Sequence, residues 1–187
     1  MEIEIQRAGT AVPNAKITTT VLQTSRLILR HQTIDDAEFI LALVNDPSWL
    51  RFIGDRDVHC VEDARNYIKK GAMESYSRHG FGLYLTALKD SGTPIGICGL
   101  VKRETLADVD IGFAFLPQYA GMGYGYESAC AVMDHARNDI GLKRVIAITN
   151  PDNVASIRLI EKLGLAFERK IRVDPDKDEI NLFACSL

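Results

Sequence analysis

Residues 110–137 constrain the fold more than any other stretch of this sequence, because their pattern predicts a strand, a glycine-rich turn and a helix in succession. Ile111, Phe113 and Phe115 alternate with smaller or polar residues, the period of two that is typical of a half-buried strand. Pro117 ends this strand, since proline has no N–H to donate to a neighbouring strand. Apolar residues then recur at helical spacing, and a glycine lies just past the predicted end of that helix.

The turn itself carries glycine at alternate positions, residues 121, 123 and 125. Glycine tolerates backbone conformations in which consecutive N–H groups point toward one spot. The helix that follows also carries partial positive charge at its N-terminus. The pattern therefore predicts a site for an anion, most simply a phosphate, although packing alone can also place glycines in such a connection.

Two common phosphate-binding motifs do not match this turn. The dinucleotide fingerprint G-x-G-x-x-G would place its third glycine on Tyr126 or on Ser128. The P-loop requires a Gly-Lys-Ser/Thr sequence, which the chain lacks. An oxidoreductase that holds a dinucleotide through this turn is therefore disfavoured.

The composition excludes several other classes of protein. At 187 residues the chain can form one domain with a full core. A net charge of −3 provides no basic field for nucleic acid. No apolar run approaches the ~20 residues of a membrane helix, and the start lacks the basic residues of a signal peptide. The four cysteines form no C-x-x-C pair, which argues against a metal site. We expect a cytoplasmic protein without nucleic-acid, membrane or metal partners.

The order of predicted elements indicates a mixed α/β fold. We expect residues 1–20 to be an N-terminal extension and residues 21–187 to form a single domain. The apolar run 145–148 follows the helix after the glycine turn, so its strand should lie parallel to the strand before that turn. Further strands are predicted near 27–29 and in a hairpin over 82–101, and helices after Thr33 and over 61–77.

The segment around Trp49 mixes apolar and charged residues without a clean period. One interpretation is a loop that buries Trp49 and Phe52 under the domain. The other is that Arg51 and Arg56 form part of a wall that binds an acceptor substrate. The two interpretations can hold for different side chains.

A second motif follows the apolar strand about thirty residues after the glycine turn. Asn153 is placed to cap a helix, with Ser156 three residues later and Glu-Lys-Leu-Gly at residues 161–164. Together with Gln118-x-x-Gly-x-Gly-x-Gly in the turn, this order of motifs resembles the signature of the GNAT superfamily of N-acetyltransferases. Residues 26–30 (RLILR) and 110–113 (DIGF) further resemble the branch that contains the ribosomal-protein alanine and serine N-terminal acetyltransferases. The resemblance covers residues 21–187, although Leu165 stands where this branch usually has phenylalanine.

The resemblance implies a GNAT-like fold with a central, mostly antiparallel sheet that splays at a parallel pair and is flanked by about four helices. It implies acetyl-CoA as co-substrate, with the pantetheine arm between the two strands that part beyond a bulge, paired with the backbone from about Phe113 to Leu116. The pyrophosphate would take backbone N–H groups from Met122 to Tyr126. The implied cofactor-binding residues are Phe115, Leu116, Gln118, Gly121, Met122, Gly123, Tyr124, Gly125, Tyr126 and Asn153.

The resemblance also implies direct attack of an amine on the thioester, without an acyl-enzyme. A backbone N–H near Phe115 would stabilise the developing oxyanion. Ser156 is the implied donor to the departing thiolate, whereas a structural interpretation makes it an extension of the helix cap.

Direct attack requires a neutral amine, and this requirement favours an α-amine over lysine. An α-amine has a pKa of about 8, against about 10.4 for lysine, so a weak base or a water chain suffices for it. Asp110 is the first candidate for such a base, with Glu104 and His79 in reserve. Asp110 could instead be a surface charge at the end of a strand.

The sequence thus predicts an acetyl-CoA-dependent N-acetyltransferase acting on a primary amine of a protein N-terminus or a small molecule. A catalytically silent acetyl-CoA-binding module is the alternative. The acceptor and the oligomeric state stay open.

Overall fold

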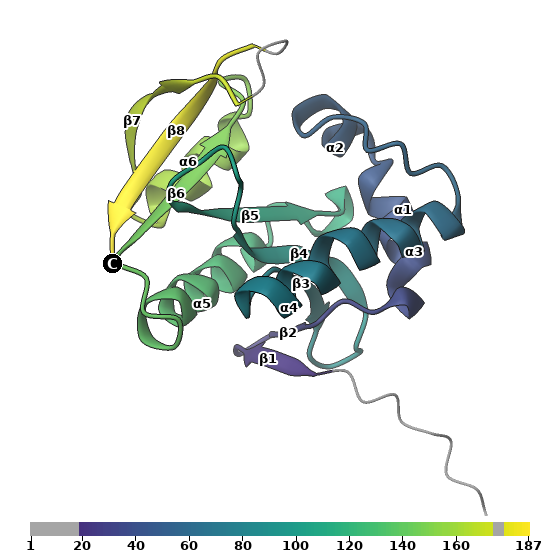
Figure 1. The fold of residues 1–187 in the computed structure, drawn as a ribbon. Helices are drawn as coiled ribbons and strands as arrows, with labels where there is room; N and C mark the ends of the chain where they lie inside the picture. The colour runs from purple at the N-terminus through teal and green to yellow at the C-terminus, as the bar shows by residue number, and fades with distance from the viewer. Residues whose placement is uncertain (1–18, 174–177) are drawn as a thin grey trace, which may run out of the picture.

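A computed structural model describes residues 19–173 and 178–187 (Figure 1). The predicted N-terminal extension lies outside the described residues as far as position 18. The fold is mixed α/β, as predicted, and its centre is one eight-stranded sheet with the strand order β1-β2-β3-β4-β5-β6-β8-β7.

Antiparallel pairs make up the sheet, except between β5 and β6. The first five strands follow one another in sequence order across the sheet, and each is linked to the next by a turn or a longer connection. The strands are β1 (Thr20–Gln23), β2 (Leu27–Arg30), β3 (Leu83–Leu88), β4 (Pro94–Val101), β5 (Val109–Phe115), β6 (Arg144–Thr149), β7 (Ala166–Ile171) and β8 (Ile180–Ser186).

Helices cover both faces of this sheet. Helices α5 (Tyr124–Asn138) and α6 (Val154–Lys162) pack on one face in a core with β2, β3 and β4. Helices α1 (Ala37–Val44) and α3 (Val61–Ile68) pack on the other, together with Ile97 of β4. None of the helices in the described ranges is both long and apolar enough to cross a membrane.

One helix was expected over residues 61–77, and the chain there is helical from α3 through a π-helical turn (Lys69–Met73) to α4 (Glu74–His79). Shorter 3₁₀ turns precede α1 (Ile34–Asp36) and follow β5 (Pro117–Tyr119).

The segment predicted as a loop around Trp49 is instead a short helix, α2 (Pro47–Phe52), so that prediction was wrong. Asp46 starts the helix because its carboxylate accepts the N–H of Ser48, and Pro47 suits the first helical position. The expected burial of Trp49 is confirmed, at 5% exposure, whereas Phe52 is only half-buried.

The parallel pair diverges soon after it begins. Strands β5 and β6 pair only at Val109–Val145 and Asp110–Ile146, although both continue beyond those residues. The register between β4 and β5 is unbroken from Asp110 to Phe115, so no bulge in that ladder accompanies the separation, in contrast to our expectation. The predicted splay of the sheet at its parallel pair is therefore present without the predicted bulge.

Candidate active site

The glycine turn joins the end of β5 to the start of α5. Gly121 and Gly123 have φ of 75° and 83°, which favour glycine, and Gly123 is the N-cap of α5. Gly125 lies in the first helical turn, where a Cβ would come within 3.3 Å of Leu159 and 3.6 Å of Phe115. The backbone conformation thus favours glycine at positions 121 and 123, and close packing favours it at position 125.

The backbone N–H groups of this turn are free. From residue 121 to residue 126, no N–H donates a hydrogen bond to an acceptor in the described part of the chain. The first bond of the helix is donated by Glu127 to the carbonyl of Gly123, at 3.0 Å. A cradle of consecutive free amides at a helix N-terminus fits a phosphate.

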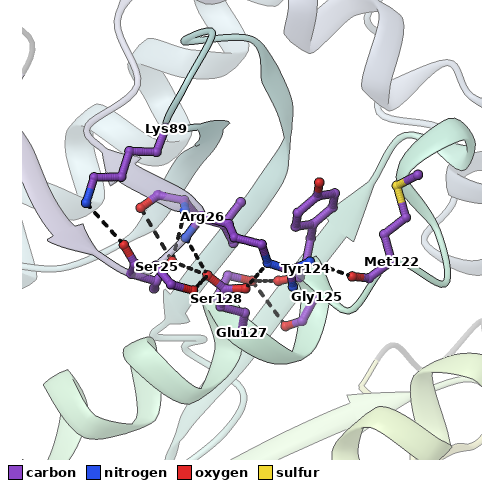
Figure 2. A network of polar contacts seen from close by, with 10 residues as sticks. Ser25, Arg26, Lys89, Met122, Tyr124, Gly125, Glu127 and Ser128 are labelled. Carbon is purple, nitrogen blue, oxygen red and sulfur yellow. Dashed lines mark hydrogen bonds and ion pairs between the residues drawn. The ribbon is translucent and has the colours of Figure 1, made fainter.

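A network of polar contacts borders the turn, and sequence reasoning did not predict it (Figure 2). The Nε of Arg26 donates to Glu127 at 2.6 Å, and its Nη1 donates to the carbonyl of Met122 at 3.0 Å. The guanidinium also lies over the Tyr124 ring, 4.5 Å from its centroid. Arg26 belongs to the RLILR motif, which contributed to the family resemblance but gave no sign of these contacts.

The edge of β5 that faces β6 carries the other free backbone groups. The N–H of Leu116 donates to the carbonyl of Ile95 at 3.0 Å, so it is used within the sheet. Because hydrogen-bonded pairs alternate along an antiparallel ladder, the N–H and C=O groups of Phe113 and Phe115 point toward the gap between β5 and β6. Gln118 lies further on, exposed in the 3₁₀ turn.

Helix α6 begins at the far side of this gap. Asn153 caps it as predicted, because its side-chain oxygen accepts the N–H of Ser156 at 3.1 Å. The hydroxyl of Ser156 has no hydrogen-bond partner among the described residues, so it does not extend the cap. Lys162 lies over the Tyr126 ring, with Nζ 4.0 Å from the centroid, and α6 thereby contacts the glycine turn.

Asp110 lies where β5 and β6 part, and it is buried at 2% exposure, so the surface-charge interpretation was wrong. Its Oδ2 accepts the Nε of Arg103 at 2.8 Å, whereas its Oδ1 has no hydrogen-bond partner in residues 19–173 and 178–187. Burial raises the pKa of Asp110 to about 6, against the opposing effects of Arg103 and the facing backbone amide of Ile148. A buried carboxylate with such a pKa is suited to accept a proton near neutral pH.

The two reserve candidates lack this environment. His79 is exposed at the end of α4, where its ring stacks on Phe81 with centroids 5.8 Å apart. Glu104 is exposed in the turn that leads to β5. His79 lines a cavity together with Tyr67, whereas Asp110 is the one of the three that is buried and has a raised pKa.

On the face opposite α5, Tyr67 lines a cavity of about 240 Å³ between the α3–α4 segment and β4. It also borders a second hollow beside Arg56. Burial raises the pKa of Tyr67, and the positive charges of Arg56 and Arg103 partly oppose this rise. Arg51 instead lies over its neighbour Phe52, with Cζ 4.8 Å from the ring centroid.

Comparison with known proteins agrees with this geometry. A family model described as an acetyltransferase (GNAT) domain matches residues 26–166. Protein YkkB of Bacillus subtilis is 31% identical over 163 residues, which are 85% of this chain and 91% of YkkB. The N-acetyltransferase YoaA of the same organism is 30% identical over 154 residues, 81% of this chain and 86% of YoaA.

Solved structures share the fold. RimL, a ribosomal L7/L12 alpha-N-protein acetyltransferase, has a TM-score of 0.78 at 17% identity, covering 96% of this chain and 100% of its own. A structure of RimL in complex with coenzyme A has a TM-score of 0.73 at 19% identity, over 88% of this chain and 96% of its own.

Proposed function

The chain belongs to the GNAT family of acetyltransferases, and from that premise we propose that it moves the acetyl group of acetyl-CoA to a primary amine. The family predicted from the sequence motifs is confirmed. The observation that carries the proposal is the row of free backbone N–H groups from residue 121 to 126, which suits the diphosphate of CoA.

Two parts of the chain hold the co-substrate in this proposal. The glycine turn binds the diphosphate, and the free backbone edge of β5 at Phe113 and Phe115 pairs with the pantetheine arm. Leu116 contributes at most its side chain, because its N–H is already bonded to Ile95. RimL, which has the same fold, is known in complex with coenzyme A.

Bound acetyl-CoA supplies an activated acetyl thioester, and the chain supplies groups for its aminolysis. Asp110 accepts the proton of the incoming ammonium group, since its carboxylate is ionised above pH 6. An amide of Phe113 or Phe115 donates to the developing oxyanion. The free hydroxyl of Ser156 donates to the departing thiolate.

In this proposal the acceptor approaches from the side of Tyr67, which lines both hollows on the sheet face opposite α5. An α-amine is the favoured acceptor, because its pKa of about 8 lies closer to that of Asp110 than the value of about 10.4 for lysine. RimL is named as an α-N-protein acetyltransferase of ribosomal L7/L12. A peptide N-terminus or a small-molecule α-amine in the cytoplasm is therefore the acceptor class that we propose.

Acetyl-CoA should raise the melting temperature in a saturable manner, and free thiol should appear when the correct amine is added. The panel for the thiol assay comprises peptides with N-terminal alanine or serine, free amino acids and polyamines, with NADH as the negative control for binding. Stabilisation without thiol release for any amine would favour a silent binding module. Stabilisation by NADH instead of acetyl-CoA would contradict the proposal altogether.

Replacing Ser156 by alanine should lower kcat at least about tenfold, because the variant loses the donor to the thiolate. It should leave the melting temperature and the affinity for acetyl-CoA nearly unchanged, because it keeps the backbone N–H that Asn153 caps. Asn153→Ala is the comparison, since loss of that cap should lower stability by about 1 kcal/mol. Steady-state kinetics and thermal unfolding of both variants measure the difference. A normal kcat in Ser156→Ala would show that another donor or water gives the hydrogen bond or proton to the departing thiolate.

A further inference from the structure

Arg26 reaches the glycine turn from the connection between β1 and β2, far away in the sequence (Figure 2). Its Nε and Nη1 are held by Glu127 and by the carbonyl of Met122, and its guanidinium plane lies over Tyr124. Three contacts thus fix one side chain whose surface is still 47% exposed. The guanidinium of this half-exposed arginine is therefore held in one place beside the glycine turn.

Glu127 is the partner that explains this arrangement. It lies in the first turn of α5, and besides the Arg26 side chain it accepts the backbone N–H of Arg26 and the hydroxyls of Thr24 and Ser25. Burial opposes its ionisation, but these hydrogen bonds outweigh burial and lower the pKa of Glu127 to about 2. A permanent negative charge therefore lies next to the amides that would bind a phosphate, and by itself it would repel one.

The third nitrogen of the guanidinium is free. Nη2 of Arg26 has no hydrogen-bond partner within the described ranges, and a Cβ on Gly123 would come within 3.3 Å of it. Gly123 lies in the middle of the row of free N–H groups. One cationic donor thus borders the cradle of amides at its centre.

We infer that Arg26 binds the diphosphate of CoA and also holds the turn that surrounds it, an inference that rests on the proposed function. Its Nη1 fixes the Met122 carbonyl and hence the course of the turn, its charge balances Glu127, and its Nη2 is left to donate to the diphosphate. Arginine is required because lysine is a point charge that cannot hold Glu127 and Met122 while offering a third donor.

The test compares three ligands that differ in their phosphates: CoA, 3′-dephospho-CoA and pantetheine. Arg26→Gln should weaken the binding of CoA and of 3′-dephospho-CoA about 10- to 100-fold, as expected for a lost charge-assisted hydrogen bond, and leave pantetheine unchanged. Arg26→Lys should fall between. Arg65→Gln is the matched control, because Arg65 is 46% exposed and paired with Glu62 on α3, away from the turn. Isothermal titration calorimetry measures all the dissociation constants.

The pattern of affinities over the three ligands decides whether Arg26 binds the diphosphate. If Arg26→Gln weakens the binding of all three ligands equally, Arg26 acts only on the stability of the fold. If it weakens the binding of CoA but not of 3′-dephospho-CoA, Arg26 contacts the 3′-phosphate and not the diphosphate. Unchanged affinity in Arg26→Gln would overturn the inference while the proposed function stands. A wild-type protein that binds neither CoA nor 3′-dephospho-CoA would overturn both.

Discussion

A valine in place of Gly123 should abolish acetyl-CoA binding, with a loss of at least about a hundredfold in affinity, while the protein stays folded. Gly123 has φ of 83°, a conformation that is strained by about 1–3 kcal/mol in a β-branched residue. The new Cβ would come within 3.3 Å of Nη2 of Arg26 and would stand among the free amides of the turn. The substitution thus fills the space that a diphosphate needs and displaces the arginine beside it.

Gly92→Val separates lost binding from general backbone strain. Gly92 has φ of 70° in the turn between β3 and β4, and a Cβ there meets nothing within 4 Å. Both variants should lose stability in thermal unfolding, but only Gly123→Val should lose binding in calorimetry. A folded Gly123→Val protein with normal affinity for acetyl-CoA would refute the assignment of the phosphate site to the glycine turn.

The sequence predicted the parts of this site that depend on local pattern. The alternation of Ile111, Phe113 and Phe115 and the glycines after them specify a strand, a turn and a helix, because each signal extends over a few neighbouring residues. The cap by Asn153 was equally local. Helix α2 was missed because residues 47–52 show no apolar period, although Asp46 and Pro47 form a local start signal.

Contacts between distant segments could not be predicted in the same way. The pair of Arg26 and Glu127 joins positions 101 residues apart, and no periodicity links them. The burial of Asp110 depends on the divergence of β5 and β6 and on Arg103 in the preceding connection. Sequence reasoning could name Asp110 as a candidate, but only the fold gives it a raised pKa.

Asparagine in place of Asp110 should stabilise the protein at neutral pH. The folded pKa of about 6 exceeds the ordinary 3.8, so between these values the native state holds a proton that the unfolded chain has released. Stability therefore falls as the pH rises through this window, and the ionised carboxylate costs on the order of 2–3 kcal/mol above pH 6. Asp110→Asn removes that cost, and Arg103 can turn to water because its side chain is 34% exposed. Its melting temperature should exceed that of the wild type at pH 7.5, and the difference should vanish near pH 4.

The same substitution should slow acetyl transfer about a hundredfold at pH 7, because a positioned base typically contributes 10²–10⁴ to the rate. In the wild type, kcat/KM should rise as the pH increases through about 6, because Asp110 loses its proton there. This rise, the acidic limb of the pH profile, should disappear in Asp110→Asn. Asp108→Asn is the matched control: Asp108 pairs with Arg144 at 2.9 Å and is 37% exposed, so its loss should leave the pH profile intact. A variant that is more stable but slower would mean that the buried charge is retained for catalysis at the expense of stability. Full activity with an unchanged limb in Asp110→Asn would instead assign proton transfer to another group or to water.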